Sequence, residues 1–185
     1  MTPLIKKLAI YTTTAMFSTS VFAGFMTLQS EDISHGAFMD KTQEFHGFGC
    51  NGGDKSPQLS WLGAPKGTKA FAVMAYDPDA PTGSGWWHWQ VVNIPADVSY
   101  LPAGAGGVAT NKMPEGSRQI SNDYGVAGFG GACPPKDHGA HRYQFTVHAL
   151  SQKLELPENA SAALTGYMIN AYSLGSASIE ALYKR

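Results

Sequence analysis

Two aspartates separated by one proline stand out in the segment Asp77-Pro78-Asp79-Ala80-Pro81. The segment follows Lys69–Tyr76, a largely apolar stretch that predicts a buried central strand, so both carboxylates should lie at a strand end. The two prolines fix φ and leave this turn few conformations. Two carboxylates held in this way are candidate functional groups, and the alternative is a rigid turn with surface aspartates.

A histidine lies among tryptophans in the segment Trp86-Trp87-His88-Trp89. The alternation of Trp87–Ile94 predicts a strand that places Trp87 and Trp89 on one face and His88 on the other. His88 is a candidate functional residue. The alternative is an ordinary core or surface histidine.

A third group of candidates lies in Cys133-Pro134-Pro135 and in Gly139-Ala140-His141-Arg142-Tyr143. A glycine shortly before His141 lets the backbone pass close to another group. We expect Arg142 to pair with a carboxylate, with Asp77 or Asp79 as its partner. Such a pair would orient a loop and would not indicate catalysis.

The remaining sequence predicts a sheet that would position these segments. Strands are expected at Leu59–Trp61, Lys69–Tyr76, Trp87–Ile94 and Arg142–Leu150, and Gly- and Pro-rich loops at 77–85 and 125–139. Loops of this kind often carry functional sites. Strands first and helices last indicate a β-sandwich or barrel with helices at one end.

Two helices are expected near the end of the chain. Asn159 should cap the first, which runs to about Ala171 and ends before Gly175. Its apolar stripe comprises Leu164, Tyr167, Met168, Ala171 and Tyr172. Ser176 or Ser178 should cap a second, short helix with Ile179, Leu182 and Tyr183 facing inward.

The first residues have the features of a secretory signal peptide. Lys6 and Lys7 precede a mostly apolar stretch, and Val21-Phe22-Ala23 forms a small-residue cleavage pattern. We therefore assign residues 1–23 to a signal peptide and 24–185 to a single domain. The alternative is a membrane anchor, although the apolar run is shorter than the ~20 residues that a span needs.

The charge of the chain argues against nucleic acid as a partner. The 185 residues contain 13 basic and 14 acidic side chains, and removal of Lys6 and Lys7 leaves a net charge of −3. The remaining basic residues are scattered, with only Lys184 and Arg185 adjacent, and form no basic cluster in the sequence.

Cys50 and Cys133 are the two cysteines of the chain. An even number in an exported protein predicts a disulfide, and the alternative is two buried thiols. The long loop that this bond closes would contribute roughly 4 kcal/mol to stability in the chain-entropy account. Neither cysteine belongs to a Cys-x-x-Cys pair, so their spacing does not indicate a metal site.

Taken together, Asp77–Pro81, the Trp-His-Trp segment and the segment from Pro134 to Tyr143 resemble the phosphatidylethanolamine-binding protein family. The resemblance is to its bacterial branch, the YbhB/YbcL-like proteins, and covers about residues 28–183. Gly47-Phe48-Gly49-Cys50 fits that branch too, and the signal peptide and cysteines place the chain nearer the secreted members. The resemblance implies a mainly β fold, a Greek-key β-sandwich with two C-terminal helices beside a small pocket for phosphate-like anions or phospholipid headgroups.

The resemblance also implies which side chains bind the ligand. They are Asp77, Asp79, Trp86, His88, Pro134, His141 and Tyr143. Eukaryotic members commonly have Gly where this chain has Cys133, so a disulfide there would reshape the mouth of the pocket. The resemblance implies no catalytic residue, cofactor or metal.

An anion beside two aspartates needs a proton or several hydrogen-bond donors. A proton shared with a phosphate oxygen, or a charged His88 or His141, would predict tighter binding at lower pH. The second carboxylate would favour an amine-bearing ligand such as phosphoethanolamine. We therefore expect an exported, periplasmic, non-enzymatic protein that binds a small anion. The sequence leaves open whether it forms a homodimer.

Three other functions are compatible with the sequence. Asp77, His88 and His141 could form the metal site of a hydrolase. Trp86, Trp87 and Trp89 could stack on sugar rings, as in a carbohydrate-binding module. The protein could also regulate a protein partner through its surface.

Overall fold

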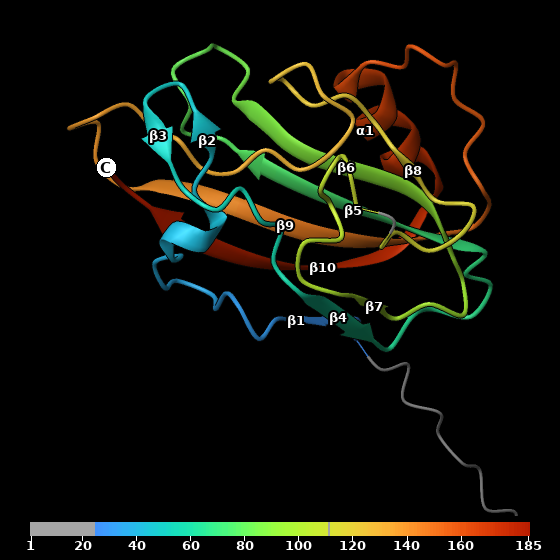
Figure 1. Ribbon diagram of the computed structural model, residues 1–185. Helices are drawn as coiled ribbons and strands as arrows, with labels where there is room; N and C mark the ends of the chain where they lie inside the picture. The colour runs from blue at the N-terminus through green and yellow to red at the C-terminus, as the bar shows by residue number, and fades with distance from the viewer. Residues whose placement is uncertain (1–24, 111) are drawn as a thin grey trace, which may run out of the picture.

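The computed structural model describes residues 25–110 and 112–185 (Figure 1). The predicted signal peptide lies outside these residues. The described chain contains one short 3-10 helix, η1 (Lys41–Gln43), and one α-helix, α1 (Ala162–Tyr172). Its strands are β1 (Thr27–Gln29), β2 (His46–Gly47), β3 (Cys50–Asn51), β4 (Leu59–Leu62), β5 (Ala70–Asp77), β6 (Trp86–Pro95), β7 (Tyr100–Leu101), β8 (Arg118–Gln119), β9 (His141–Leu150) and β10 (Ser173–Tyr183).

The strands form two main sheets and one hairpin. The larger sheet is antiparallel, with the order β10-β9-β5-β6-β8, and the smaller has the order β1-β4-β7. Strands β2 and β3 form the separate hairpin. Figure 1 shows the smaller sheet on one side of the larger sheet and α1 on the other. The four predicted strands are all present, and most of their ends differ from the prediction by one residue.

The main hydrophobic core lies between the two sheets. Leu59 and Trp61 of the smaller sheet face Phe71 and Phe145 of the larger one, and all four are almost fully buried. The rings of Trp61 and Phe71 meet edge to face with centroids 5.4 Å apart. Burial of side chains of this size contributes roughly 2 kcal/mol each. The prediction of a mainly β, sandwich-like fold is confirmed.

Helix α1 covers part of the other face of the larger sheet. Its Ile169 packs with Ala72, Val92 and Leu150 in a second, smaller core. This helix is 11 residues long. Among the described residues, no helix has both the length and the apolar composition that a bilayer span requires.

The prediction of a second C-terminal helix is wrong, because Ser173–Tyr183 forms the edge strand β10. This strand pairs antiparallel with nearly the whole of β9. Ile179, Ala181 and Tyr183 are buried at every second position, which is the period of a strand. Over so few residues, an apolar pattern does not distinguish a helix from a strand. The pairing of β10 with β9 satisfies the backbone N–H and C=O groups along one side of β9.

The first helix is present, but its start and its buried face differ from the prediction. It begins after Ser161, whose Oγ accepts a hydrogen bond from the backbone N–H of Leu164, so Ser161 is the cap and Asn159 is not. The buried residues are Thr165, Gly166 and Ile169. Leu164 and Tyr167, expected in the apolar stripe, are 39% and 68% exposed.

Candidate functional site

Three neighbouring strands bring the candidate residues to one end of the larger sheet. Strand β5 ends at Asp77, which pairs with Trp86 at the start of β6. Strand β9, which begins at His141, lies on the other side of β5. Because the strands are antiparallel, the loop after β5 and the loop before β9 meet at this end.

A pocket of about 180 Å³ opens between these loops. Six of the seven predicted ligand-binding residues line it, and Asp79 does not. The lining residues are Phe48, Asp77, Ala80, Pro81, Thr82, Trp86, His88, Tyr124, Cys133, Pro134, Pro135, His141 and Tyr143.

A β-bulge in β6 turns His88 toward the pocket. Ala75 of β5 pairs with Trp89 and Tyr76 pairs with Trp87, so His88 is an extra residue between two pairs. Trp89 enters the main core and His88 lies against Tyr143 of the same core, whereas Trp87 packs on the ring of Tyr76. The prediction that Trp87 and Trp89 share one face is therefore wrong, because a bulge shifts the alternation by one residue.

A buried hydrogen-bond chain runs from the pocket to the surface. The Oδ2 atom of Asp77 lies 2.7 Å from Nδ1 of His141, and Nε2 of His141 lies 2.8 Å from Nδ1 of His138. Asp77 and His141 are buried, whereas His138 is exposed. The Oδ1 atom of Asp77 accepts a hydrogen bond from the backbone N–H of Asp79, so protein donors reach both carboxylate oxygens.

Asp79 binds Arg142 and does not face the pocket. Its Oδ2 accepts hydrogen bonds from the backbone N–H and from Nε of Arg142, and its Oδ1 accepts one from Nη2. The guanidinium lowers the pKa of Asp79 to about 2. The predicted pairing of Arg142 with an aspartate is confirmed. Asp79 therefore offers no free carboxylate to an amine-bearing ligand in the pocket.

His88 has one ring nitrogen with a protein partner and one without. Its Nδ1 donates to the carbonyl oxygen of Gly130 over 2.7 Å, which leaves Nε2 as the acceptor of a neutral ring. This Nε2 is buried and has no hydrogen-bond partner among the described residues. Burial lowers the pKa of His88, and the Gly130 carbonyl and the Asp77 charge act against this shift.

Two more buried polar atoms on the pocket wall lack partners in the described part of the chain. They are Nε1 of Trp86 and the hydroxyl of Tyr143. Burial raises the pKa of Tyr143, and the charge of Asp77 adds to this shift, so the phenol keeps its proton. An indole N–H and a phenol O–H are both donors. With His88, they form a polar wall that can bind an anion.

Tyr124, Phe48 and His138 also belong to this site and were not among the predicted ligand-binding residues. Tyr124 lines the pocket, with its ring centroid 5.2 Å from that of Trp86 and 4.0 Å from that of Phe45. Phe48 lines the mouth, and its position between two glycines was an available signal of an unusual turn. His138 was visible in the predicted loop, but only folding shows that it contacts His141.

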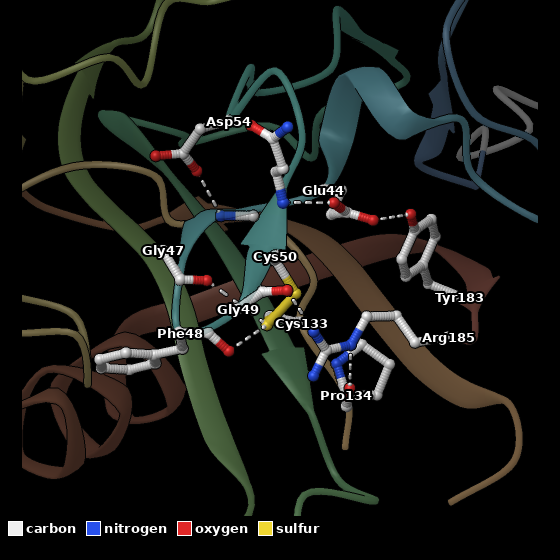
Figure 2. Close-up of a disulfide and its surroundings, with 12 residues drawn as sticks. Glu44, Gly47, Phe48, Gly49, Cys50, Asp54, Cys133, Pro134, Tyr183 and Arg185 are labelled. Atoms are coloured by element: carbon white, nitrogen blue, oxygen red, sulfur yellow. Dashed lines mark hydrogen bonds between the residues drawn. A yellow bond between two sulfur atoms is a disulfide. The ribbon is translucent and has the colours of Figure 1, made fainter. Parts of the chain in front are cut away.

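The predicted disulfide joins Cys50 to Cys133 and is confirmed. Figure 2 shows that it connects strand β3 to the pocket wall that contains Pro134. Cys133 itself lines the pocket. The disulfide therefore forms part of the pocket wall through Cys133. This is the position at which the family resemblance implied glycine in eukaryotic members.

The metal-site and sugar-binding alternatives need arrangements of these residues that the described part of the chain does not show. The described residues contain no cluster of three or more His, Cys, Asp or Glu side chains arranged to hold a metal ion. The tryptophans do not form one sugar-stacking platform, because Trp86 lines the pocket, Trp89 is fully buried and Trp87 packs on Tyr76.

Comparisons with known proteins identify the family. The family model for phosphatidylethanolamine-binding protein matches residues 29–184. The chain is 50% identical over 181 residues to UPF0098 protein YbcL of Escherichia coli, covering 97% of this chain and 99% of that protein. It is 48% identical over 159 residues to UPF0098 protein YbhB of the same organism, covering 85% and 99%.

A solved structure gives the same result. The crystal structure of E. coli YbcL, described as a member of the mammalian PEBP family, aligns with a TM-score of 0.85 and 52% identity over 88% of this chain and 99% of that one. This similarity extends over most of both chains and agrees with the sequence matches. The chain therefore belongs to the phosphatidylethanolamine-binding protein family.

Proposed function

We propose that this chain is an exported, non-enzymatic binding protein that holds a phosphate-like anion, free or within a headgroup such as phosphoethanolamine, in its pocket. One observation carries the proposal. Three buried polar atoms on the pocket wall, Nε1 of Trp86, Nε2 of His88 and the hydroxyl of Tyr143, have no protein partner among the described residues. A buried polar atom without a partner costs roughly 1–3 kcal/mol, so a ligand that supplies partners gains affinity.

The chemistry of these atoms favours an anion that carries or takes up a proton. Trp86 and Tyr143 donate to phosphate oxygens. His88 Nε2 accepts a proton from a protonated phosphate, or becomes protonated and donates. The donors that occupy both Asp77 oxygens reduce repulsion between this carboxylate and the anion.

Export to the periplasm is part of the proposal. Its supports are the signal-peptide pattern of residues 1–23 and the Cys50–Cys133 disulfide, a bond typical of oxidising compartments. The mature protein would then be the single domain of residues 24–185.

A titration with phosphoethanolamine tests the binding function. Amide and indole NMR signals of residues 24–185 would be followed for the native protein and for Tyr143→Phe and His88→Ala, each of which removes one of the unpartnered polar groups. We expect the signals of Trp86, His88 and His141 to shift together, and both variants to lose the effect. His148→Ala is the matched control, because His148 is also buried but lies outside the pocket.

The absence of shifts in the pocket signals would be equally informative. If no pocket signal moves at millimolar phosphoethanolamine or inorganic phosphate, the pocket does not bind this chemistry, and binding of a protein partner at the surface becomes the function to test. If the pocket signals shift equally in His88→Ala, the ligand does not use the unpartnered Nε2, and this atom gives no support to anion binding.

A further inference from the structure

The hairpin of β2 and β3 presents an aromatic side chain in an unfavourable setting. Phe48 and Gly49 form its turn with φ values of 50° and 78°, in the left-handed region. Residues with a Cβ are uncommon there, and a two-residue hairpin turn favours Asn, Asp or Gly at such positions. The Phe48 side chain is also 74% exposed. Neither backbone preference nor burial in the core explains a phenylalanine at this position.

The structure holds this turn against the pocket through two connections (Figure 2). The disulfide joins Cys50, directly after the turn, to Cys133 of the pocket wall, and Cys133 Sγ lies 3.8 Å from the carbonyl oxygen of Phe48. Arg185 donates from Nη1 to the carbonyl oxygen of Gly49 and from Nε to that of Pro134. Both connections link the hairpin tip to the wall of the same cavity.

Aromatic rings continue from Phe48 toward the polar wall. The ring centroid of Phe48 lies 5.6 Å from that of Tyr124, which in turn lies 5.2 Å from that of Trp86. The other exposed residues that line the pocket are Pro81, Thr82 and Pro135, and none carries a charge. The ionisable lining residues are more deeply buried. The pocket thus has a polar interior and an uncharged, mainly apolar mouth, at which the Thr82 hydroxyl already donates to the carbonyl oxygen of Gly85.

We propose that Phe48 is a specificity-determining residue, whose ring packs on the apolar substituent of a phosphate ester while the phosphate occupies the polar interior. The inference rests on the proposed anion binding. It adds the class of ligand, phosphate esters with an apolar group, and a role for the clamped hairpin. Free phosphate has no group that reaches Phe48 and should be insensitive to this residue.

Isothermal titration of inorganic phosphate, phosphoethanolamine and phenyl phosphate tests the proposal. We expect the native protein to bind phenyl phosphate more tightly than phosphate. Phe48→Ala should reduce this preference about five-fold, the size of one aromatic contact, and should change phosphate affinity less than two-fold. The loss for phosphoethanolamine, with its short polar substituent, should be smaller than that for phenyl phosphate.

Phe38→Ala is the matched control for removal of an exposed phenylalanine. Phe38 is 55% exposed and lies outside the pocket, so its loss should leave all three affinities unchanged. Arg185→Gln tests the clamp, because it removes one connection and keeps the disulfide. It should lower the preference for phenyl phosphate in the native background and have no further effect in Phe48→Ala.

The outcomes separate this inference from the function on which it rests. If inorganic phosphate does not bind at all, the proposed function fails. If phosphate binds but Phe48→Ala keeps the native preference for phenyl phosphate, the role of Phe48 is wrong and the anion site stands. If Arg185→Gln lowers the preference equally in both backgrounds, the clamp does not act through Phe48.

Discussion

The Oδ2 atom of Asp77 lies 2.7 Å from Nδ1 of His141, and the two side chains are only 4% and 2% exposed. They come from the end of β5 and the start of β9, 64 residues apart in the sequence. This contact holds a carboxylate and an imidazole at the pocket without exposing either to solvent. His138, on the surface, continues the chain from the other nitrogen of His141.

Replacing His141 should therefore destabilise the protein much more than replacing His138. His141→Ala removes the side-chain donor of a buried carboxylate, which should cost about 3 kcal/mol in the free energy of unfolding. His138→Ala removes an exposed partner and should cost less than about 0.5 kcal/mol. Urea denaturation at pH 7 measures both. Equal losses of unfolding free energy in the two variants would show that the buried Asp77–His141 contact stabilises the protein no more than the exposed contact of His138.

Phosphate should bind more tightly as the pH falls. Burial lowers the pKa of His88, so Nε2 is unprotonated near neutral pH in the free protein. A phosphate oxygen at this atom requires a proton, on the ligand or on the ring, so binding takes up a proton and is favoured at lower pH. Between pH 8 and pH 5.5 we expect the dissociation constant to fall about ten-fold.

Calorimetric titration of inorganic phosphate at several pH values measures this dependence. His88→Gln should flatten it, whereas His148→Gln, a change outside the pocket, should preserve it. A dissociation constant that is constant or rises toward pH 5.5 would contradict proton uptake at this site.

The stability of the fold should fall in acid partly because of His148. Burial between β9 and its neighbours lowers the pKa of His148 to about 4, below the ordinary histidine value of 6.5. The unfolded chain therefore binds a proton in this window while the folded His148 stays neutral, so stability is full above pH 6.5 and decreases toward pH 4. Between pH 7 and pH 4.5 the loss from this residue should be about 2 kcal/mol.

Urea denaturation of the native protein and of His148→Gln at these two pH values isolates the effect. The variant should lose less stability than the native protein over the same interval, whatever its stability at pH 7. The same loss in both would assign the acid sensitivity to other groups, such as His88.

Gly130 should not tolerate a side chain. A Cβ at this position would lie 2.3 Å from the Tyr124 ring, and the Gly130 carbonyl accepts the hydrogen bond of His88. Gly130→Ala should therefore displace Tyr124, cost about 2 kcal/mol and weaken the near-ultraviolet circular dichroism of the aromatic wall.

Gly166→Ala is the matched control, because a Cβ there meets only Trp87, at 4.0 Å, and lies within α1. It should be neutral or stabilise the protein by up to about 1 kcal/mol through helix propensity. Equal behaviour of the two variants would mean that the packing of Tyr124 on Gly130 does not restrict the loop.

Local patterns determined much of this protein. Apolar stretches and Gly-Pro boundaries predicted the strands that became β4, β5, β6 and β9, because their side chains fill a core at a period of two. The combined motifs placed Asp77, Trp86, His88, Pro134, His141 and Tyr143 at one site, and all six line one pocket. The cysteine count predicted the disulfide.

Only the tertiary structure decided the remaining features, because they depend on partners distant in the sequence. Ser173–Tyr183 became a strand since β9 offers it an unpaired edge, and a bulge opposite β5 turned His88 away from Trp87. Arg142 binds both carboxylate oxygens of Asp79, so this side chain does not face the pocket. Phe48 reached the mouth because Cys133 and Arg185, more than 80 residues away, hold its hairpin there.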